Sequence, residues 1–598
     1  MARAIQQPHF AILVGLASVF IAINLVVGSW ERAGETLGDM DDAMRLLQVR
    51  HFLDGHAWFD LHEPRLGPLG YESHWSRLID AGLAGLFLLF NVFTDAASAE
   101  RLMRAVWPML WLAPAVLGMV AAAWRLAGRD AAIVALLLAM AGLPAFQQFL
   151  PGRIDHHNVQ IALAVLVLAT TVWSDRRPWT AWAAGALSGL ALAIGLENLI
   201  FVALCGAAFA LRYAVDRTAA GALVRYGAAL AASAAAAFLV SVPPDHWGRT
   251  VCDEIAINWA APAIVAGALL ALGAGRLEAR SVRMRGALVA AVAAAAGAIF
   301  VALEPHCLGG PYAMMDPRLR AIWFDHVSEM EPLWKIAPRS PAVAAAVIIF
   351  PAVSLMATLL LGAARERRGD PAYLTAASVL VAACILTVAV AKMCMYAMWL
   401  GMPLVAAGCM HLFARLRLTN LVSRAAVALL LTPILLTAGV IAIAEAAGAP
   451  PAAKQDGRVA GGCFRIANYA PLAALPPGLV ATEIDFGSFV LASTPHSVLG
   501  APYHRLAEGV LAAHDAFALP PDEAHVLFTR LNVDYVVTCG DRAPPGLSAA
   551  ERRVGLWAAL HAGAPPAWLA RLPSAPGQVF TVYRVLRDVA ASDPGRER

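Results

Sequence analysis

The sequence predicts a polytopic α-helical membrane protein that carries an α/β domain at its C-terminal end. Of its 598 residues, 60% are hydrophobic and only 15% are charged, which is far more apolar than the composition of a soluble domain. Apolar runs of membrane length recur up to about residue 448, and Pro-Pro and Gly-Gly pairs, charged residues and short alternating runs follow. We therefore expect a transmembrane domain over residues 1–448 and a separate α/β domain over residues 449–598.

About thirteen apolar runs are long enough to be membrane spans. They cover residues 10–28, 103–124, 130–149, 158–174, 180–195, 198–211, 226–242, 259–275, 286–303, 341–363, 372–391, 394–413 and 423–446. A shorter run, 81–93, lies between Asp80 and Asp95. If it does not cross, every Arg-rich connection falls on one side of the membrane, which the positive-inside rule makes cytoplasmic. We therefore expect 81–93 to be an interfacial or re-entrant helix.

This topology predicts a multi-pass protein of a bacterial inner membrane, with a cytoplasmic N-terminus and a periplasmic C-terminal domain. The basic start and the first apolar run are interpreted as an uncleaved span, because no small-residue cleavage site follows. Two outer connections are long, residues 29–102 and the fifth outer loop, 304–340. Four cysteines lie on the outer side, where an oxidising compartment permits disulfides and buried free thiols fit the sequence equally well. They are Cys252, Cys307, Cys463 and Cys539.

The C-terminal segment alternates between strand and helix patterns. Strands are predicted over 480–492, with an interruption at Asp485-Phe486-Gly487, over 533–538 and over 579–585. Helical periodicity predicts helices over 504–517 and 522–531. A segment of about 150 residues is large enough to bury a core of its own.

The first of three polar clusters in the outer loops is acidic. Asp39, Asp41 and Asp42 follow shortly after the first apolar run. Several carboxylates within four residues form a hard-oxygen site suited to Mg²⁺ or Mn²⁺, or hold a base against an acceptor hydroxyl. Because Asp is also favoured in the first turn of a helix, a solvated helix start is the competing interpretation.

The second cluster is Arg153-Ile154-Asp155-His156-His157-Asn158, between two apolar runs. Asp155 and His157 are two residues apart, so at the end of an extended loop they point to the same side and can share one cation. Adjacent histidines also suggest zinc, but no Cys and no second His pair at ligand spacing accompanies them. Helix capping by Asp155 is the competing interpretation.

The third cluster is the loop 304–340, which contains Glu329 and Glu331. A loop of this length without a Gly/Ser-rich linker composition is typically functional. Lys392 is a further single cation at the outer end of an apolar run. Such a Lys often only reaches for the interface, but the positive-inside bias disfavours it on the outer side, which points to an anionic ligand such as a lipid phosphate.

In order and position these motifs resemble those of GT-C glycosyltransferases, and most closely those of the catalytic subunit of oligosaccharyltransferase and its bacterial single-subunit relatives. In that family the first outer loop carries an essential Asp, followed by an Arg and an aromatic, Gly-bearing stretch. The segment from Asp41 through Arg45 and Gly55 to Trp58 is similar to it. The second loop of the family carries a pair of acids preceded by Arg, and residues 153–157 resemble it with His in place of the second acid.

The resemblance continues towards the C-terminus. The fifth outer loop of the family carries a Ser-Val-Ser-Glu type motif, and Val327-Ser328-Glu329-Met330-Glu331-Pro332 is similar to it. Lys392 with Tyr396 stands where the family has an Arg that contacts the lipid-linked pyrophosphate.

The resemblance implies a GT-C fold of about thirteen spans with an external α/β domain, and a polyprenyl phosphate or pyrophosphate sugar as the donor. It implies that the catalytic residues are Asp41, Asp42 and Glu329. A divalent metal, Mn or Mg, would be held by Asp42, Asp155, His157 and Glu329, and the donor phosphate would be bound by Lys392, Arg153 and Tyr396. These residue types suit the chemistry, because a metal and a Lys stabilise charge on a leaving phosphate and a carboxylate takes the acceptor proton.

The external domain departs from the family. Members that glycosylate Asn in a sequon carry a Trp-Trp-Asp-Tyr-Gly motif there, and this chain has Thr482-Glu483-Ile484-Asp485-Phe486-Gly487 instead. Without the Trp pair, sequon recognition is not expected. The acceptor-domain candidates are Asp485, Phe486, Gly487, Tyr503, His504 and Arg505.

We therefore expect a membrane glycosyltransferase that transfers a sugar or oligosaccharide from a polyprenyl-linked donor to a non-sequon acceptor, which is a glycan, a lipid or a protein. A protein oligosaccharyltransferase is the first alternative. A transporter or lipid flippase fits less well, because the conspicuous acids lie in outer loops and not near the middle of spans. The expected partners are the donor, the acceptor and membrane lipids, and the net charge of +3 suggests no nucleic acid.

Overall fold

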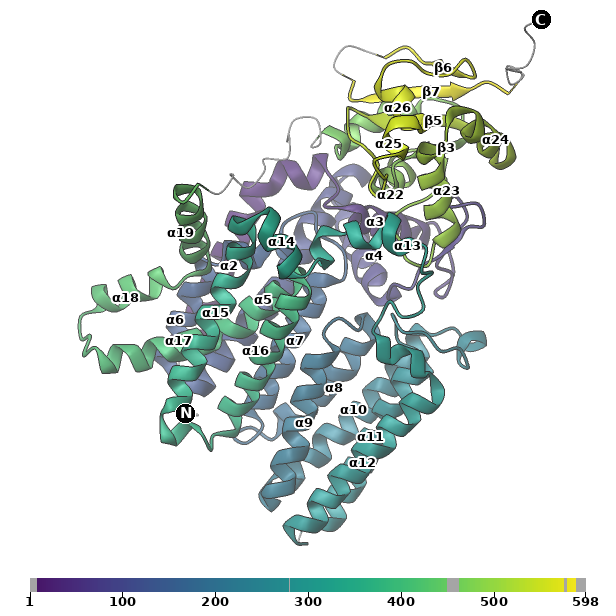
Figure 1. The fold of residues 1–598 in the computed structure, drawn as a ribbon. Helices are drawn as coiled ribbons and strands as arrows, with labels where there is room; N and C mark the ends of the chain where they lie inside the picture. Colours follow the sequence, from purple (N-terminus) through teal and green to yellow (C-terminus); the bar gives the residue numbers. More distant parts are fainter. Residues whose placement is uncertain (1–7, 279, 449–461, 575–577, 588–598) are drawn as a thin grey trace, which may run out of the picture.

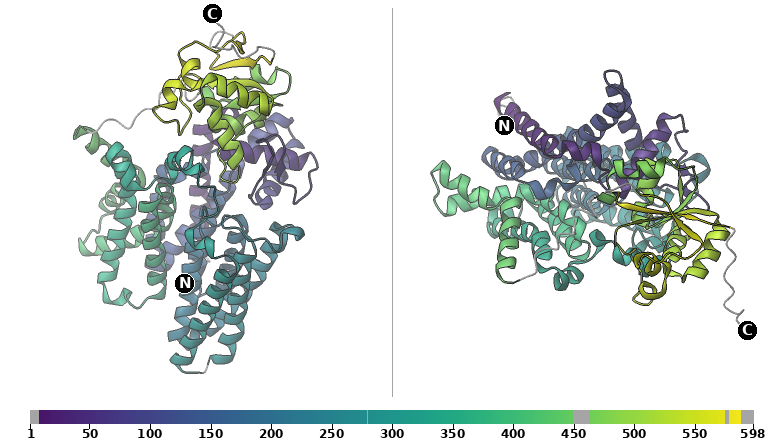
Figure 2. Two further views of the ribbon diagram at one scale, coloured as in Figure 1. Left: turned by 45° about the vertical axis from the view of Figure 1, so that its right-hand side comes forward. Right: turned by 90° about the horizontal axis from the view of Figure 1, so that it is seen from above.

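The computed structural model describes residues 8–278, 280–448, 462–574 and 578–587, and it has two parts (Figure 1). Long helices form a bundle, and a smaller domain with a β-sheet lies at one end of it. The rotated views in Figure 2 place this external domain towards one side of the bundle. The boundary predicted at residue 449 falls at the start of the segment 449–461, which lies outside the described residues.

The helices of the bundle follow the predicted apolar runs. Among the described residues, eight are long and apolar enough to cross a membrane: α2 (Pro8–Glu35), α5 (Ala96–Ala127), α10 (Ala220–Ser241), α11 (Ile257–Leu277), α12 (Val282–Leu303), α15 (Pro341–Ala363), α16 (Pro371–Ala389) and α17 (Cys394–Arg415). Two bent pairs pass the same test, α6 (Arg129–Met140) with η1 (Leu143–Phe149) and α18 (Leu421–Leu430) with α19 (Pro433–Ala446). Three apolar helices are shorter, α7 (His157–Trp173), α8 (Trp179–Ile194) and α9 (Leu199–Val215).

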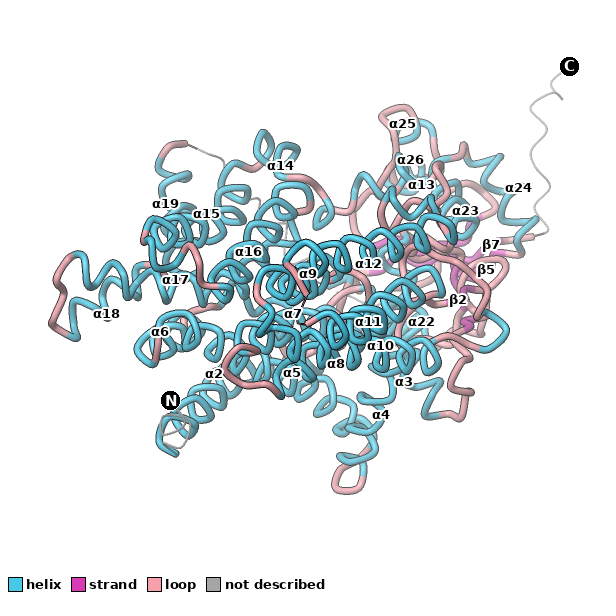
Figure 3. Tube along the Cα trace, turned by 90° about the horizontal axis from the view of Figure 1, so that it is seen from below, coloured by secondary structure: helices cyan, strands magenta, loops and turns pink. Residues whose placement is uncertain are grey.

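Every predicted apolar run coincides with one of these helices or bent pairs, so the polytopic helical fold is confirmed. The helices α7, α8 and α9 have 17, 16 and 17 residues. At about 1.5 Å per residue they are about 24–26 Å long, slightly less than a hydrocarbon core of about 30 Å. The figure of thirteen crossings therefore stays a prediction. Seen from below, α18 projects from one edge of the bundle, and the strands lie at the opposite edge (Figure 3).

A bend in the chain carries the second polar cluster to the end of the bundle that faces the external domain. The axes of α6 and η1 differ by 71°. After η1 the chain turns at Gly152, whose φ of +99° favours glycine. The Gly152 N–H donates to the Arg104 carbonyl of α5 at 2.9 Å, so residues 153–157 lie across the end of α5.

The first outer loop contains two helices and a small hairpin: α3 (Met40–Leu53), β1 (His62–Glu63), β2 (Tyr71–Glu72) and α4 (Arg77–Asn91). The helix α4 coincides with the run 81–93 and has 15 residues, about 22 Å, which is too short for a straight crossing. Its last turn and the residues beyond expose Leu88, Leu89 and Phe93, as an interfacial helix would. The fifth outer loop contains only short helices, among them α13 (Leu319–Ile322), η6 (Ser328–Met330) and α14 (Leu333–Arg339).

The external domain is an α/β domain, as predicted. Its sheet has the order β4-β3-β5-β7-β6, with β3 parallel to both β4 and β5 and with β7 antiparallel to both β5 and β6. The strands are β3 (Leu479–Thr482), β4 (Ser497–Val498), β5 (Val533–Cys539), β6 (Leu569–Arg571) and β7 (Phe580–Val585). The helices are α21 (Ala470–Ala473), α22 (Ile484–Ser493), α23 (Ala507–Ala518), α24 (Pro521–Leu531), α25 (Glu551–Val554) and α26 (Leu556–His561).

The prediction of a strand over 480–492 was wrong beyond Thr482. The stretch Asp485-Phe486-Gly487 lies in the first turns of α22. A short apolar run suits a buried strand and a buried helix alike. A Cβ on Gly487 would lie 2.1 Å from the carbonyl oxygen of Gly500, so only glycine permits the close approach of α22 to this loop.

All four cysteines of the predicted outer side are paired. Cys252 is bonded to Cys307, and Cys463 is bonded to Cys539. The first bond joins the connection between α10 and α11 to the fifth outer loop, and the second lies within the external domain. The four free cysteines, Cys205, Cys384, Cys394 and Cys409, all lie in helices of the bundle.

Candidate functional site

Two of the three acids at the start of α3 form a helix cap. The Asp39 carboxylate accepts from the N–H groups of Asp41 and Asp42 at 3.0 and 3.1 Å, and Asp42 Oδ2 accepts from the Asp39 N–H at 3.1 Å. This reciprocal pattern is a capping box, which satisfies donors that a helix start leaves free. The interpretation as a helix start therefore holds for Asp39 and Asp42.

Asp42 also holds the second outer loop. Its side chain is fully buried, and its Oδ1 accepts from the N–H groups of Ile154 and Asp155 at 2.6 and 3.0 Å. Its Oδ2 lies 3.0 Å from Arg153 Nη1. Both oxygens of this carboxylate are thus occupied by protein donors, which leaves Asp42 joining the first loop to the second.

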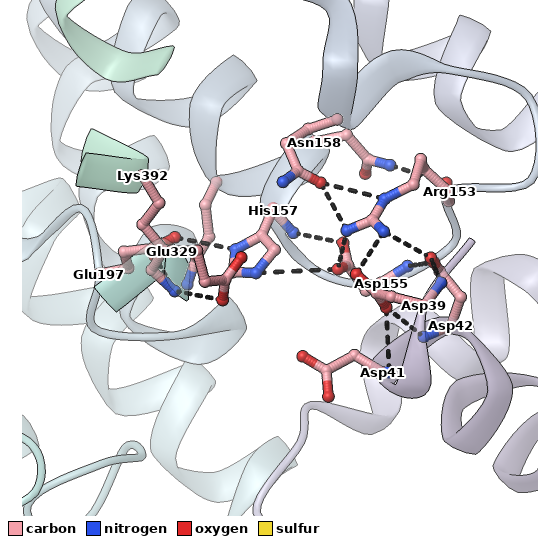
Figure 4. Close-up of polar contacts among 12 residues, drawn as sticks. Asp39, Asp41, Asp42, Arg153, Asp155, His157, Asn158, Glu197, Glu329 and Lys392 are labelled. Atoms are coloured by element: carbon pink, nitrogen blue, oxygen red, sulfur yellow. Dashed lines mark hydrogen bonds and ion pairs between the residues drawn. The ribbon is translucent and has the colours of Figure 1, made fainter. Parts of the chain in front are cut away.

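Arg153 lies at the centre of the acids. Its guanidinium pairs with Asp39, with Asp42 and with Asp155, the last at 3.0 Å, and two of its nitrogens donate to Gln148 Oε1 at 3.1 and 2.8 Å. Its five N–H donors are used in these contacts. Arg153 neutralises the buried acids, and its guanidinium lies away from Lys392, where the donor phosphate is expected (Figure 4).

Asp41 is the acid of the first cluster that takes no part in the contacts described so far. Among the described residues its carboxylate has no hydrogen-bond or ion-pair partner, and in Figure 4 it is turned away from Arg153. Burial, together with the negative charges of Asp39 and Asp155, raises the pKa of Asp41 from 3.8 to about 8. A carboxylate that neighbours other acids and lacks a cation is a natural ligand for a metal ion.

A chain of charged groups runs from Asp155 to the fifth outer loop. Asp155 Oδ1 accepts from the His157 N–H at 3.0 Å, and its Oδ2 lies 3.7 Å from His157 Nε2. His157 Nδ1 lies 2.9 Å from Glu197 Oε2, and Glu197 Oε1 lies 2.8 Å from Lys392 Nζ. Lys392 Nζ is also 3.8 Å from Glu329. Figure 4 shows these side chains in a row.

The charges of the chain stabilise one another. Burial disfavours an ionised Asp155, but the neighbouring His157 and Arg153 outweigh it and hold the pKa of Asp155 below its usual value. Burial is likewise outweighed at Glu197, where Lys392 and His157 hold the pKa well below the usual range. Both carboxylates are therefore ionised at neutral pH.

Glu197 joins the candidate site in the structure, and the sequence did not predict it there. It lies between α8 and α9, and it also accepts a hydrogen bond from the Tyr396 hydroxyl at 3.0 Å. The available signal was a lone carboxylate between two apolar runs, which is costly without a partner. Two side chains that bind Glu197, Lys392 and Tyr396, were both among the predicted site residues.

The donor set of Asp41, Asp155 and His157 fits a divalent cation. One ligand atom from each residue lies within 4.8 Å of the other two. Asp39, Asp42 and Asp155 are equally close, but the guanidinium of Arg153 already occupies that position. The structure thus brings the predicted Asp155 and His157 together with Asp41, whereas Glu329 lies on the Lys392 side of the chain.

A cavity of about 410 Å³ opens beside this chain. Its polar wall includes Glu197, Lys392, His156 and Gln160. Towards the external domain it is also lined by His74, Asp253, Glu254 and His504. Its apolar wall comes from the ends of helices, with Leu192, Ile194, Leu196, Leu199, Ile200, Leu386, Val390 and Met393. A cavity with one charged wall and one apolar wall suits an amphiphilic ligand.

The acceptor-domain candidates separate into two groups. Asp485 pairs with Arg542 of the same domain, Phe486 is buried and Gly487 packs on Gly500, so these three stabilise the domain itself. Tyr503 donates to the Met40 carbonyl at 3.0 Å and thereby docks the domain on α3.

His504 and Arg505 instead line a second cavity of about 570 Å³, together with Tyr71, Glu72 and Asp316. This cavity lies where the external domain meets the outer loops, and its lining is rich in charged side chains. It is the polar counterpart of the largely apolar cavity beside Lys392.

No protein-family model and no curated protein matches the sequence. Solved structures are similar. The archaeal oligosaccharyltransferase AglB from Archaeoglobus fulgidus, in complex with an inhibitory peptide and a dolichol-phosphate, has a TM-score of 0.65 and 15% identity over 98% of this chain and 75% of that chain. Its apo form has a TM-score of 0.65 and 15% identity over 89% and 69%. Its complex with Zn and sulfate has a TM-score of 0.56 and 15% identity over 88% and 68%. The likeness shows the fold alone: this chain has a fold similar to that of the archaeal oligosaccharyltransferase AglB.

Proposed function

We propose that the protein is a glycosyltransferase that moves a sugar or oligosaccharide from a polyprenyl phosphate or pyrophosphate donor to an acceptor other than a sequon Asn. The observation that carries this proposal is the continuous row from the Asp41, Asp155 and His157 group through Glu197 to Lys392, beside a cavity with an apolar wall. A cation site and a fixed ammonium side by side are what transfer from a lipid phosphate requires.

Lys392 and Tyr396 are proposed to bind the donor phosphate. Lys392 lines the cavity, and its partners Glu197 and Glu329 balance its charge while no donor is present. The apolar wall would hold the first isoprene units, and the anionic headgroup would lie against the ammonium group. The ammonium group then stabilises the negative charge that develops on the phosphate when the bond between the sugar and its oxygen breaks.

Asp41, Asp155 and His157 are proposed to hold a divalent cation, with Asp42 and Arg153 positioning them. A bound cation would add Lewis-acid stabilisation of the departing phosphate. The donor set combines two carboxylates with one imidazole, which favours Mn²⁺ over Mg²⁺. The structure of AglB with Zn and sulfate agrees with a cation in this fold.

The acceptor is proposed to enter from the polar cavity at the external domain and to attack the anomeric carbon of the sugar. Its proton passes to a carboxylate, and Asp41 is placed for this because no described donor occupies its oxygens. Glu329, on η6 of the fifth outer loop, has a side chain that is 46% exposed and faces the same space as Lys392. It is proposed to orient the acceptor.

A non-sequon acceptor is supported by the external domain. The segment that replaces the tryptophan motif is buried in α22, and Asp485 is engaged by Arg542. Its atoms are not available to read an acceptor hydroxyl. The glycan, lipid or protein acceptor is then recognised by the polar lining near His504 and Arg505.

We place the protein in a bacterial inner membrane, with a cytoplasmic N-terminus and a periplasmic external domain. Both disulfides lie on the side assigned to the periplasm, as an oxidising compartment requires. At the other end of the bundle, Arg125 pairs with Asp175 and Asp370, so several Arg-rich connections meet there.

Transfer is tested with purified protein in liposomes and lipid-linked sugars extracted from the host after radioactive labelling. Lys392→Ala and Asp41→Asn are each expected to lower the rate by about 10²–10³, the usual effect of removing one stabilising group. Asp54→Asn is the matched control, an exposed acid at the other end of α3. Undiminished transfer by both variants would reject the proposal.

The acceptor is identified by mass spectrometry of the periplasmic glycoproteins, glycolipids and glycans of cells with and without the gene. The proposal expects a product that lacks glycosylated Asn in sequons. Sequon glycopeptides that disappear with the gene would establish a protein oligosaccharyltransferase instead.

A further inference from the structure

We propose that the protein binds a second transition-metal ion, of the Zn²⁺ class, through His74, Asp253 and His504. This site is separate from the Asp41 group and does not depend on the proposed transfer reaction. The three residues come from three segments that are distant in sequence: the first outer loop before α4, the connection between α10 and α11, and the external domain before α23.

The geometry of the three side chains carries the proposal. One ligand atom from each residue lies within 4.8 Å of the other two. The rings of His74 and His504 have centroids 4.9 Å apart, and His504 Nε2 lies 2.5 Å from Asp253 Oδ2. Tetrahedral zinc with bonds of about 2.0–2.1 Å separates its ligand atoms by about 3.3 Å, so small side-chain rotations are enough to form the site.

The donor types suit zinc. Two imidazoles and one carboxylate leave the fourth tetrahedral position open, as in zinc sites that bind a water or a substrate oxygen. His74 Nδ1 is buried and has no hydrogen-bond partner among the described residues, which is unusual for a buried polar atom. The two ring nitrogens of His74 are therefore not both accounted for by protein contacts.

A second layer of contacts holds the carboxylate in place. Arg505 Nε donates to Asp253 Oδ2 at 2.7 Å, and Arg505 Nη2 donates to Asp253 Oδ1 at 2.6 Å. Arg505 also pairs with Glu254 at 2.9 Å. Second-layer contacts of this kind orient metal ligands. The adjacent disulfide between Cys252 and Cys307 fixes the loop that carries Asp253.

The position of the site suggests what it does. Asp253 and His504 line both the cavity beside Lys392 and the polar cavity under the external domain. An ion there would tie the external domain to two outer loops beside these two cavities. It would be able to bind an oxygen of a molecule held in either of them.

Metal content and the Co²⁺ absorption spectrum of the full-length protein in detergent test the inference. The protein is stripped with a chelator and reloaded with Co²⁺ alone. We expect His74→Gln to weaken Co²⁺ binding at this site by more than about 100-fold, since loss of a second-layer partner alone lowers affinity 10–100-fold. The matched control is His62→Gln, an exposed histidine of the same loop. Asp155→Asn, which alters only the Asp41 group, should leave the site intact.

A ligand exchange keeps the test decisive if His74→Gln folds poorly. His74→Cys retains a metal ligand, and it should add a thiolate-to-cobalt charge-transfer band that His62→Cys lacks. Absence of that band in a folded His74→Cys protein, or Co²⁺ binding by His74→Gln equal to that of the wild type, would overturn the proposal. Failure of sugar transfer would leave it untouched, because the readout is metal binding.

Discussion

Replacing Asp41 and Asp42 separately by Asn should change stability in opposite directions. In Asp42→Asn the amide oxygen can keep the bonds from Ile154 and Asp155, but the amide NH₂ then faces the Asp39 N–H and the Arg153 guanidinium. Arg153 keeps Asp39 and Asp155, so what is lost is the charged acceptor of two buried donors, at about 1.5–3 kcal/mol each, or about 3–5 kcal/mol together. With an unfolding entropy of about 2.1 cal/mol/K per residue over 598 residues, the unfolding midpoint should fall by about 2–4 °C.

Asp41→Asn should raise the midpoint. The pKa of Asp41 is raised from 3.8 to about 8, so its contribution to stability is fully present below pH 3.8 and is lost by about pH 8. At pH 7 most of that loss has occurred, and a neutral Asn does not incur it. We expect a gain of up to about 4 kcal/mol at pH 7, since about three pKa units of the loss have occurred there and one unit corresponds to about 1.4 kcal/mol.

Both variants are measured by thermal unfolding at pH 7 in one detergent with excess chelator, because a bound cation would mask the effect at Asp41. The control is Asp54→Asn, which should leave the midpoint within about 0.5 kcal/mol of the wild type. Equal destabilisation by both substitutions would refute the conclusion that Asp42 binds the second loop while the Asp41 carboxylate is bound by no described donor.

Three further outcomes are expected. Glu197→Gln removes the partner of Lys392 and should lower the unfolding midpoint by the equivalent of about 3–5 kcal/mol; an unchanged midpoint would mean that the row of charges is not formed. Cation affinity measured by calorimetry should rise by at least about tenfold per pH unit up to about pH 8, because binding displaces the proton of Asp41 and any proton on the His157 ring, and Asp41→Asn should make this rise about tenfold per pH unit shallower. Replacing Cys463 and Cys539 by Ser opens a loop with a sequence separation of 76 and should destabilise the external domain by about 4 kcal/mol in urea unfolding, whereas equal midpoints would exclude a stabilising bond.

Hydrophobicity and charge alone predicted the fold of the bundle. Runs of apolar residues have to be helices in a membrane, because only helices satisfy their own backbone there, and each run indeed became a helix or a bent pair. The external domain was harder. Residues 480–492 form a strand and then a helix, and hydrophobicity at this length does not distinguish the two.

The structure brings the candidate site residues together, and their membership in a functional site and their roles stay predictions. The sequence pointed to Asp41, Asp42, Arg153, Asp155, His157, Glu329 and Lys392, and Figure 4 shows all of these side chains near one another. Adjacent acids look equivalent in a sequence. They differ in the structure because Asp42 accepts hydrogen bonds from the backbone N–H groups of the second loop, whereas Asp41 points elsewhere.

Partners from distant segments account for what the sequence did not predict. Arg153 was expected at the donor phosphate, and only the folded chain shows that three carboxylates surround it. Glu197 joins the site because it pairs with Lys392, which lies almost two hundred positions later in the chain. Such pairs depend on how the helices pack against one another, and neither periodicity nor local motifs predict that packing.

The central claim is that Asp41, Asp155 and His157 hold a cation next to Lys392, where a polyprenyl phosphate binds. Electron paramagnetic resonance of Mn²⁺ in the full-length protein, with and without polyprenyl phosphate, tests it most directly. The protein carries His74→Gln in this experiment, so that the second proposed metal site does not contribute to the spectrum. We expect one bound Mn²⁺ whose spectrum shows coupling to an imidazole nitrogen and, on addition of the lipid, to phosphorus. The nitrogen coupling should disappear when His157→Gln is added and persist when His62→Gln is added instead. Bound Mn²⁺ that keeps its nitrogen coupling with His157→Gln, or that shows no phosphorus coupling with lipid when His157 is intact, would contradict the claim.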